Sequence, residues 1–89
     1  LNTGLKEVLN LIPVEFKYKN DVKKKVHIGL IAEEVLKIEP RLVFFESDGV
    51  TPRGIEFELL TALLVKSDQD LHDRILELEK KIKVLENKP

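Results

Sequence analysis

Residues 58–87 read ELLTALLVKSDQDLHDRILELEKKIKVLEN, and this stretch decides the fold. It contains neither Gly nor Pro and is dominated by Leu, Glu and Lys, which are strong helix formers. A helix of this length spans about 45 Å, whereas a compact chain of this size has a diameter of roughly 30 Å. The chain therefore cannot cover the whole helix, and we expect another chain to cover its far end.

A heptad repeat runs along this helix. Alternating spacings of four and three residues are typical of the apolar seam of a coiled coil. The d positions are Leu64, Leu71, Leu78 and Leu85, and the a positions are Asp68, Ile75 and Ile82. Asp68 interrupts the apolar seam. The alternative, an amphipathic helix packed on its own domain, is disfavoured by the length of the helix.

Charged residues flank the seam in a pattern that predicts a parallel arrangement. Arg74 and Lys81 occupy g positions, and Glu79 and Glu86 occupy the e positions that follow them. In a parallel coil each g residue faces the next e residue of its neighbour, so both pairs are attractive. Exposed pairs of this kind contribute only ~0.2–1 kcal/mol each. They choose the orientation, while the Ile/Leu seam supplies the affinity.

The number of helices in the coil stays open between two and three. Ile at a with Leu at d favours a dimer. Residues 74–79 resemble the Arg-apolar-x-x-apolar-Glu signature of short parallel trimers, and residues 81–86 repeat it with Lys in place of Arg. We favour a homotrimer, so the expected fold class is α+β, with a parallel trimeric coiled coil at the C-terminal end.

The chain divides into two predicted domains, a small α+β domain over residues 1–57 and the long helix over residues 58–89. Residues 14–19 alternate between apolar and polar side chains, which predicts a half-buried strand. A turn is expected at Ser47-Asp48-Gly49, because Gly tolerates a positive φ. The other expected elements are a helix over residues 1–11 with Thr3 as its N-cap, a hairpin strand over 26–30, a helix over 31–39, a buried strand over 42–45 and a short strand over 55–57.

Composition excludes several kinds of function. The 89 residues contain 15 Lys plus Arg against 16 Asp plus Glu, a net charge of -1, which disfavours general nucleic-acid binding. Without Cys there are no disulfides, thiol nucleophiles or Cys-based zinc sites. No apolar run is long enough to span a membrane. The chain has no Met, so we expect it to be a processed piece of a longer protein.

No catalytic or metal-binding set is evident, and we expect no cofactor. His27 lies in an expected strand without a second His nearby, so a structural role is favoured. Glu33 and Glu34 diverge by about 100° on a helix and cannot act as a close pair. The lysines between Lys17 and Lys25 form a basic strip that is best explained as a solvated hairpin tip.

The middle of the chain resembles a known family. The stretch His27-Ile28-Gly29-Leu30-Ile31-Ala32-Glu33-Glu34-Val35, followed by Pro40 and Val43, is similar to the signature of the intramolecular chaperone domains of phage tailspikes, tail fibres and neck appendages, the endosialidase chaperone family. Glu33 stands where the family usually has Gln. Residues 5–19 are similar to the family's opening helix and first strand. Ile55, Phe57, Leu60, Leu63 and Leu64 are similar to its later apolar stretch.

This resemblance implies a chaperone that trimerises, sets the register of an upstream fibre and then cuts itself free. The family's nucleophilic Ser, the Asp after it and a Lys base would lie upstream of Leu1, so this chain by itself would be inactive as a serine peptidase. Ser47-Asp48 lacks the following Lys and lies in a turn. The implied partners are two further copies of the chain and, transiently, the upstream fibre, in the host cytoplasm during phage assembly. The released domain would be absent from the mature virion.

Two other functions remain open. The chain could be a plain oligomerisation or adaptor module without a chaperone role, since its long helix would look the same. It could also bind DNA, because a transcription factor shares the family, although only the strip between Lys17 and Lys25 would support that function.

Overall fold

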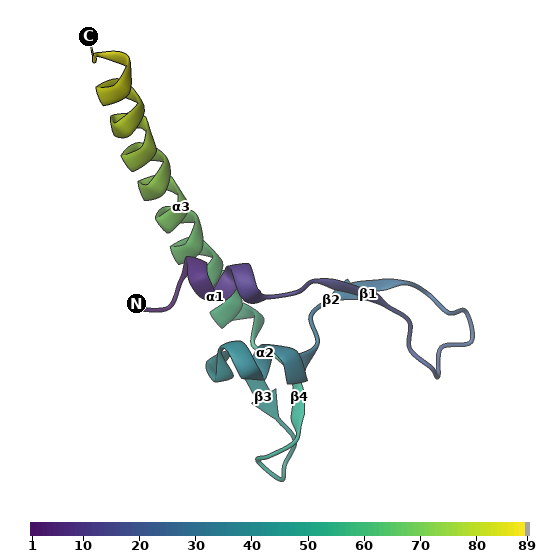
Figure 1. The fold of residues 1–89 in the computed structure, drawn as a ribbon. Helices are drawn as coiled ribbons and strands as arrows, with labels where there is room; N and C mark the ends of the chain where they lie inside the picture. Colours follow the sequence, from purple (N-terminus) through teal and green to yellow (C-terminus); the bar gives the residue numbers. More distant parts are fainter. Residues whose placement is uncertain (89) are drawn as a thin grey trace.

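The computed structural model describes residues 1–88, and it is an α+β chain with a long C-terminal helix, as predicted (Figure 1). It extends over 66 × 31 × 18 Å, because the second half of the last helix projects from a small folded body. The elements in chain order are α1 (Leu5–Asn10), β1 (Val14–Phe16), β2 (His27–Gly29), α2 (Ala32–Ile38), the 3₁₀ turn η1 (Pro40–Leu42), β3 (Val43–Phe45), β4 (Pro52–Ile55) and α3 (Phe57–Glu86).

The first hairpin forms an arm that reaches away from the body (Figure 1). Strands β1 and β2 are antiparallel, with Val14 opposite Gly29 and Phe16 opposite His27. The predicted hairpin is therefore confirmed, although both strands are shorter than expected. The ring of Phe16 stacks on His27 with 5.6 Å between centroids, and Tyr18 meets the same imidazole edge-on at 4.9 Å. His27 thus lies in a ring cluster of its own hairpin.

The second hairpin joins β3 and β4 through the turn predicted at Ser47-Asp48-Gly49. Gly49 has φ 72°, a left-handed conformation that favours glycine. The Asp48 carboxylate accepts hydrogen bonds from the Thr51 hydroxyl and from the backbone N–H groups of Thr51 and Val50. These bonds, led by the one from the Thr51 hydroxyl, lower the pKa of Asp48 to about 2. The role of Asp48 is to close the turn.

A small core holds the body together. Among the described residues, five apolar side chains are buried: Val35, Leu42, Val43, Ile55 and Leu63. They come from α2, η1, β3, β4 and α3, so each element of the body except α1 supplies at least one. Val8 and Leu11, from α1 and the residue after it, pack against this cluster from the side. The first turns of α3 are thus part of the body.

Helix α1 lies against α3 and is fixed there through its N-terminal amides. The Leu5 N–H donates to Oδ2 of Asp70 on α3 at 3.1 Å, and the Gly4 N–H donates to Oε1 of Glu7 at 2.9 Å. Free amides of a first helical turn need such acceptors. Lys66 pairs with the same Asp70 carboxylate, and this pair, with the Leu5 amide, lowers the pKa of Asp70.

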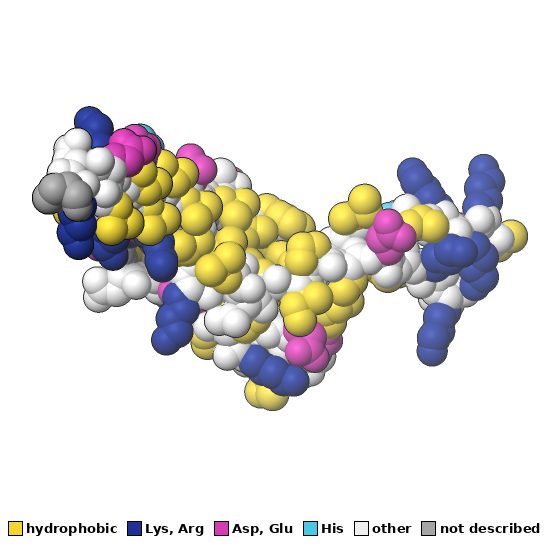
Figure 2. All heavy atoms as spheres, turned by 45° about the horizontal axis from the view of Figure 1, so that its top comes forward, with side chains coloured by type: hydrophobic (Ala, Val, Ile, Leu, Met, Phe, Trp, Pro, Cys, Tyr) yellow, Lys and Arg dark blue, Asp and Glu magenta, His cyan; other side chains and the backbone are white. Residues whose placement is uncertain are grey.

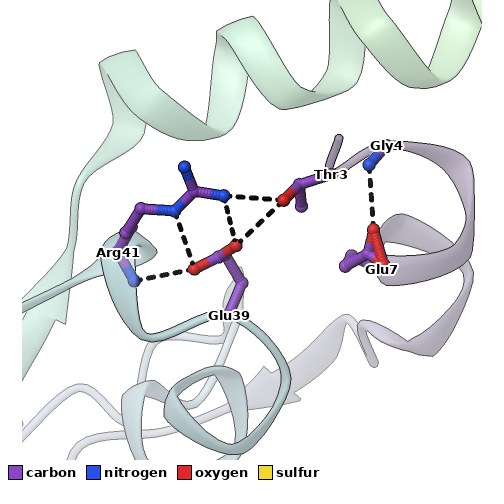
Figure 3. A network of polar contacts seen from close by, with 5 residues as sticks. All are labelled: Thr3, Gly4, Glu7, Glu39 and Arg41. Atoms are coloured by element: carbon purple, nitrogen blue, oxygen red, sulfur yellow. Dashed lines mark hydrogen bonds and ion pairs between the residues drawn. The ribbon is translucent and has the colours of Figure 1, made fainter. Parts of the chain in front are cut away.

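Thr3 does not cap α1, so that prediction was wrong. Its hydroxyl donates to Oε1 of Glu39 at 3.3 Å and accepts from the Arg41 guanidinium at 2.6 Å (Figure 3). Arg41 also donates to both carboxylate oxygens of Glu39. We call this network the Thr3 clasp. It ties the segment before α1 to the loop after α2.

Three other expectations need correction. The strand predicted over 55–57 lies earlier, in β4, and Phe57 begins α3, because the helical pattern extends past Glu56. The strand predicted as buried over 42–45 buries Val43 alone of its three β3 residues, since Phe44 and Phe45 are 38% and 37% exposed on a sheet of only two strands. The spacing of Leu9 and Ile12 from Leu5 and Val8 in the sequence predicts one apolar face of the first helix, yet Leu9 and Ile12 are both exposed.

Truncation of Leu63 should destabilise the body. Leu63 is 3% exposed and joins α3 to the core, so Leu63→Ala should lower the free energy of unfolding by about 2–5 kcal/mol. Urea unfolding followed by circular dichroism measures this change. Leu76→Ala, on the same helix but 45% exposed, should change it by less than about 0.5 kcal/mol. Equal effects of the two substitutions would contradict the assigned core.

The Thr3 clasp should make stability depend on acid pH. Its hydrogen bonds from Arg41 lower the pKa of Glu39 from 4.5 to about 2, so the folded chain holds this carboxylate charged more strongly than the unfolded chain. The resulting stability is fully present above pH 4.5 and is lost as pH falls towards 2. The melting temperature of Glu39→Gln should therefore lie below wild type at pH 6, with a gap that closes by pH 2.

Glu33→Gln is the matched control, because Glu33 is exposed on α2. Its melting temperature should follow that of the wild type at every pH. A gap between Glu39→Gln and wild type that stays constant from pH 6 to pH 2 would disprove the role of the clasp.

Candidate self-association surface

The apolar seam of α3 lies open to solvent along its whole length. We use "seam" for the predicted d and a residues Leu64, Leu71, Ile75, Leu78, Ile82 and Leu85. Their side chains are between 44% and 65% exposed, and beyond Asp70 every described residue of α3 is exposed. Large apolar side chains repeated on one helix face are normally buried against a partner. Nothing within residues 1–88 covers this face.

The flanking charges are equally open. The ion pairs within residues 1–88 are Lys37–Glu34, Arg41–Glu39 and Lys66–Asp70, and none of them involves a g or e position of the far half of α3. The predicted flanking residues Arg74, Glu79, Lys81 and Glu86 are all exposed. Near the end of the helix, Lys81 lines a shallow groove with Leu85, Lys80 and Val84. These charges are available to an apposed helix.

The exposed apolar surface continues from α3 onto the body. Figure 2 shows hydrophobic side chains gathered from the C-terminal end of α3 towards the small domain, while Lys and Arg side chains surround the outer end of the hairpin arm. A groove lies where α1 meets α3, and we call it the α1–α3 groove. It is lined by Val8, Thr61, Leu64, Val65, Ser67, Asp68 and Leu71.

Sequence reasoning missed one member of the heptad pattern. Phe57 precedes Leu64 by seven residues and therefore occupies a d position, and its side chain is 66% exposed. Its assignment to a strand hid this position. Counting the repeat back through Thr61 would have found it, but the polar a positions Thr61 and Asp68 weaken the pattern there.

The residues of the family motif lie together around the junction of the arm and the body. His27 and Gly29 are in β2, Ile31 precedes the first turn of α2, and Pro40 begins η1. Within α2, Val35 is 2% exposed at the centre of the core and Ala32 packs against that core. Glu33 and Glu34 are exposed on the outer face of α2. The seam lies on a different element, so the motif and the seam are separate surfaces.

The remaining candidates show no catalytic arrangement. Ser47-Asp48 is part of the β3–β4 turn, and the Asp48 carboxylate is occupied by Thr51 and Val50. Within residues 1–88, no three acidic or imidazole side chains lie close enough to hold a metal ion. In the same range, no helix is both long and apolar enough to cross a membrane.

Comparison with known proteins gives one match. Residues 1–44 match the model of a peptidase family described as the chaperone of endosialidase. The matched residues run from the segment before α1 into β3, and they include the whole His27–Val35 motif and Pro40. Neither the curated proteins nor the solved structures give a significant match. The similarity noted for Ile55 to Leu64 lies outside the matched residues and stays a prediction.

Proposed function

Residues 1–44 of this chain belong to the chaperone of endosialidase family, and from this premise we propose that the chain is an intramolecular chaperone that trimerises through α3. Its client would be an upstream phage fibre or tailspike in the same parent chain. The observation that carries the proposal is the exposed seam, which extends from a body that matches the chaperone of endosialidase family over residues 1–44. An apolar heptad face of this kind is buried by packing against other helices.

The seam supports a parallel association of equal chains. Ile at a and Leu at d form interlocking layers, and the pairs Arg74–Glu79 and Lys81–Glu86 become attractive between copies only in the parallel arrangement described above. The Arg-apolar-x-x-apolar-Glu pattern favours three copies. A parallel bundle places the three small bodies at one end, beside one another.

This arrangement would help the attached fibre to fold. Tethering three chains raises the local concentration of their strands to the order of millimolar. Parallel alignment fixes the register before slow, non-local β pairing begins, a step that otherwise exposes strands to aggregation. The family name points to an endosialidase-like fibre as the client.

Self-cleavage belongs to the same proposal, because the matched family is a peptidase family. We place the nucleophilic Ser and its Lys base upstream of Leu1. A Lys amine can activate a Ser hydroxyl when desolvation lowers the pKa of the amine. Completed folding would bring the two together, so that cleavage follows correct assembly in the host cytoplasm and releases the domain from the virion.

A plain oligomerisation module is the second candidate. The exposed seam by itself would serve either role equally well. The two functions differ in whether the small body, and not only the coil, is needed by the fibre.

The trimer should depend on the seam. At micromolar concentration, light scattering should give three times the mass of the 10.2 kDa chain. Leu78→Asp would bring three carboxylates together on an apolar axis, so it should weaken association by about a hundredfold or more. Leu76→Asp, which lies off the seam, should associate as the wild type does. A monomeric wild type would disprove the proposal, and a dimer would require its revision.

The upstream fibre should need both parts of the chain. In the full parent chain, Leu78→Asp should reduce the yield of trimeric, heat-resistant fibre by about tenfold or more. Replacement of residues 1–89 by an unrelated parallel trimeric coiled coil should not restore that yield. Gel electrophoresis without boiling measures the trimer in each case. Full restoration by the unrelated coil would favour the plain oligomerisation module.

A further inference from the structure

The uninterrupted part of the seam is short. It contains five apolar layers from Leu71 to Leu85, about two heptads, whereas coiled-coil patterns are usually sustained over three to four heptads. Towards the body the next a positions are Asp68 and Thr61, which add no apolar layer. Three copies joined only through this segment would form a small interface. Further contact between copies is therefore expected nearer the body.

The α1–α3 groove is the continuation of the seam. Three residues that line it, Leu64, Asp68 and Leu71, occupy successive d, a and d positions. Val8 of α1 also lines it, so the body itself contributes to this surface. The three large apolar side chains that α3 contributes, Leu64, Val65 and Leu71, are 46%, 54% and 44% exposed. A helix that covers Leu71 and follows α3 towards the body must enter this groove.

The flanking positions change character along the same path. In the far half of α3 the g and e positions are charged, as in Arg74 and Glu79. Nearer the body the pair of g and e residues formed by Leu60 and Val65 is apolar, while Ser67 and His72 form the pair between them and the charged ones; Leu60 also packs in part against the core of its own body. In a parallel coil Leu60 of one copy would face Val65 of the next, in the place that the charged pair occupies further on. Leu60 and Val65 thus add apolar surface on the two sides of the polar a positions Thr61 and Asp68.

We propose that a second copy of this chain fills the α1–α3 groove, so that the interface between copies extends from α3 onto the body. Val65 then packs against Leu60 of the neighbouring copy, beside the Val8 wall of its own groove. The proposal rests on the proposed function, since it requires parallel association through α3. Asp68 is the only charged residue that lines the groove, and copies aligned in register bring their Asp68 carboxylates near one another, a cost that the apolar contacts of Leu64, Val65 and Leu71 have to exceed.

This interface would align the three copies at the point where each chain enters α1. The N-terminal end of α1 is bonded to α3 through Leu5 and Asp70, in the turn next to the groove. Contact between copies at this level would therefore set the three α1 helices relative to one another. The upstream segment of each copy would then reach its α1 at an equivalent position. Register control of an upstream fibre requires this alignment.

Sedimentation equilibrium of Val65→Asp tests the proposal. The carboxylate would enter an apolar contact. The protein concentration at which the trimer dissociates should therefore be higher than for the wild type by about tenfold or more, although the seam from Leu71 onward is intact. Val50→Asp is the matched control, because Val50 is 75% exposed in the β3–β4 turn, and its association should equal that of the wild type. Circular dichroism checks that both variants keep the wild-type helix content.

Cross-linking gives a readout that does not depend on stability. The chain contains no Cys, so a mixture of Leu60→Cys and Val65→Cys chains carries one thiol per copy. A short bismaleimide should join the two variants in the mixture far more than either variant alone. A mixture of Leu60→Cys and Leu76→Cys chains should give no such excess.

The outcomes separate the two proposals. A trimer in which Val65→Asp associates like the wild type, or in which Leu60→Cys and Val65→Cys do not cross-link, overturns the groove interface and leaves the proposed function standing. A wild type that is monomeric at micromolar concentration overturns both.

Discussion

The structure depends on a mismatch between the length of α3 and the size of the body that it belongs to. Five buried apolar side chains hold the body together, and only Leu63 among them comes from the 30-residue α3. The apolar residues further along the helix lie beyond any surface that the body can offer. Exposed apolar area is costly in water, and this cost is the physical basis of the association that we propose for α3.

Helix α3 also links the surface for association to the part of the chain that matches the chaperone family. The match covers residues 1–44, whereas the seam lies on α3. Contacts that join these parts include Leu63 in the core, the Leu5 amide on Asp70, and the groove wall formed by Val8. These contacts fix the position of α1 relative to α3. The association that we propose through α3 would therefore also set the position of the chain that enters α1.

The sequence predicted those features that depend on neighbouring residues. The long helix, the first hairpin and the Gly49 turn follow from local periodicity and turn chemistry, and the structure has each of them. It did not predict the Thr3 clasp or the bond from Leu5 to Asp70, since these join residues 36 and 65 positions apart. The start of α3 at Phe57 was missed for a related reason. A β-favouring aromatic beside Ile55 reads as a strand until the helix that follows is counted back to it.

Several residues of the family motif have a role in packing and none of them forms a chemical site. Val35 fills the core, Ala32 packs on that core, and His27 stacks on Phe16 within the arm. Gly29 also lies against Phe16, whose ring would be 3.4 Å from an added Cβ. These residue types are thus explained by packing at the junction of arm and body. Glu33 and Glu34 have no such packing role: both are exposed on α2, and Glu34 pairs with Lys37 one turn further along the helix.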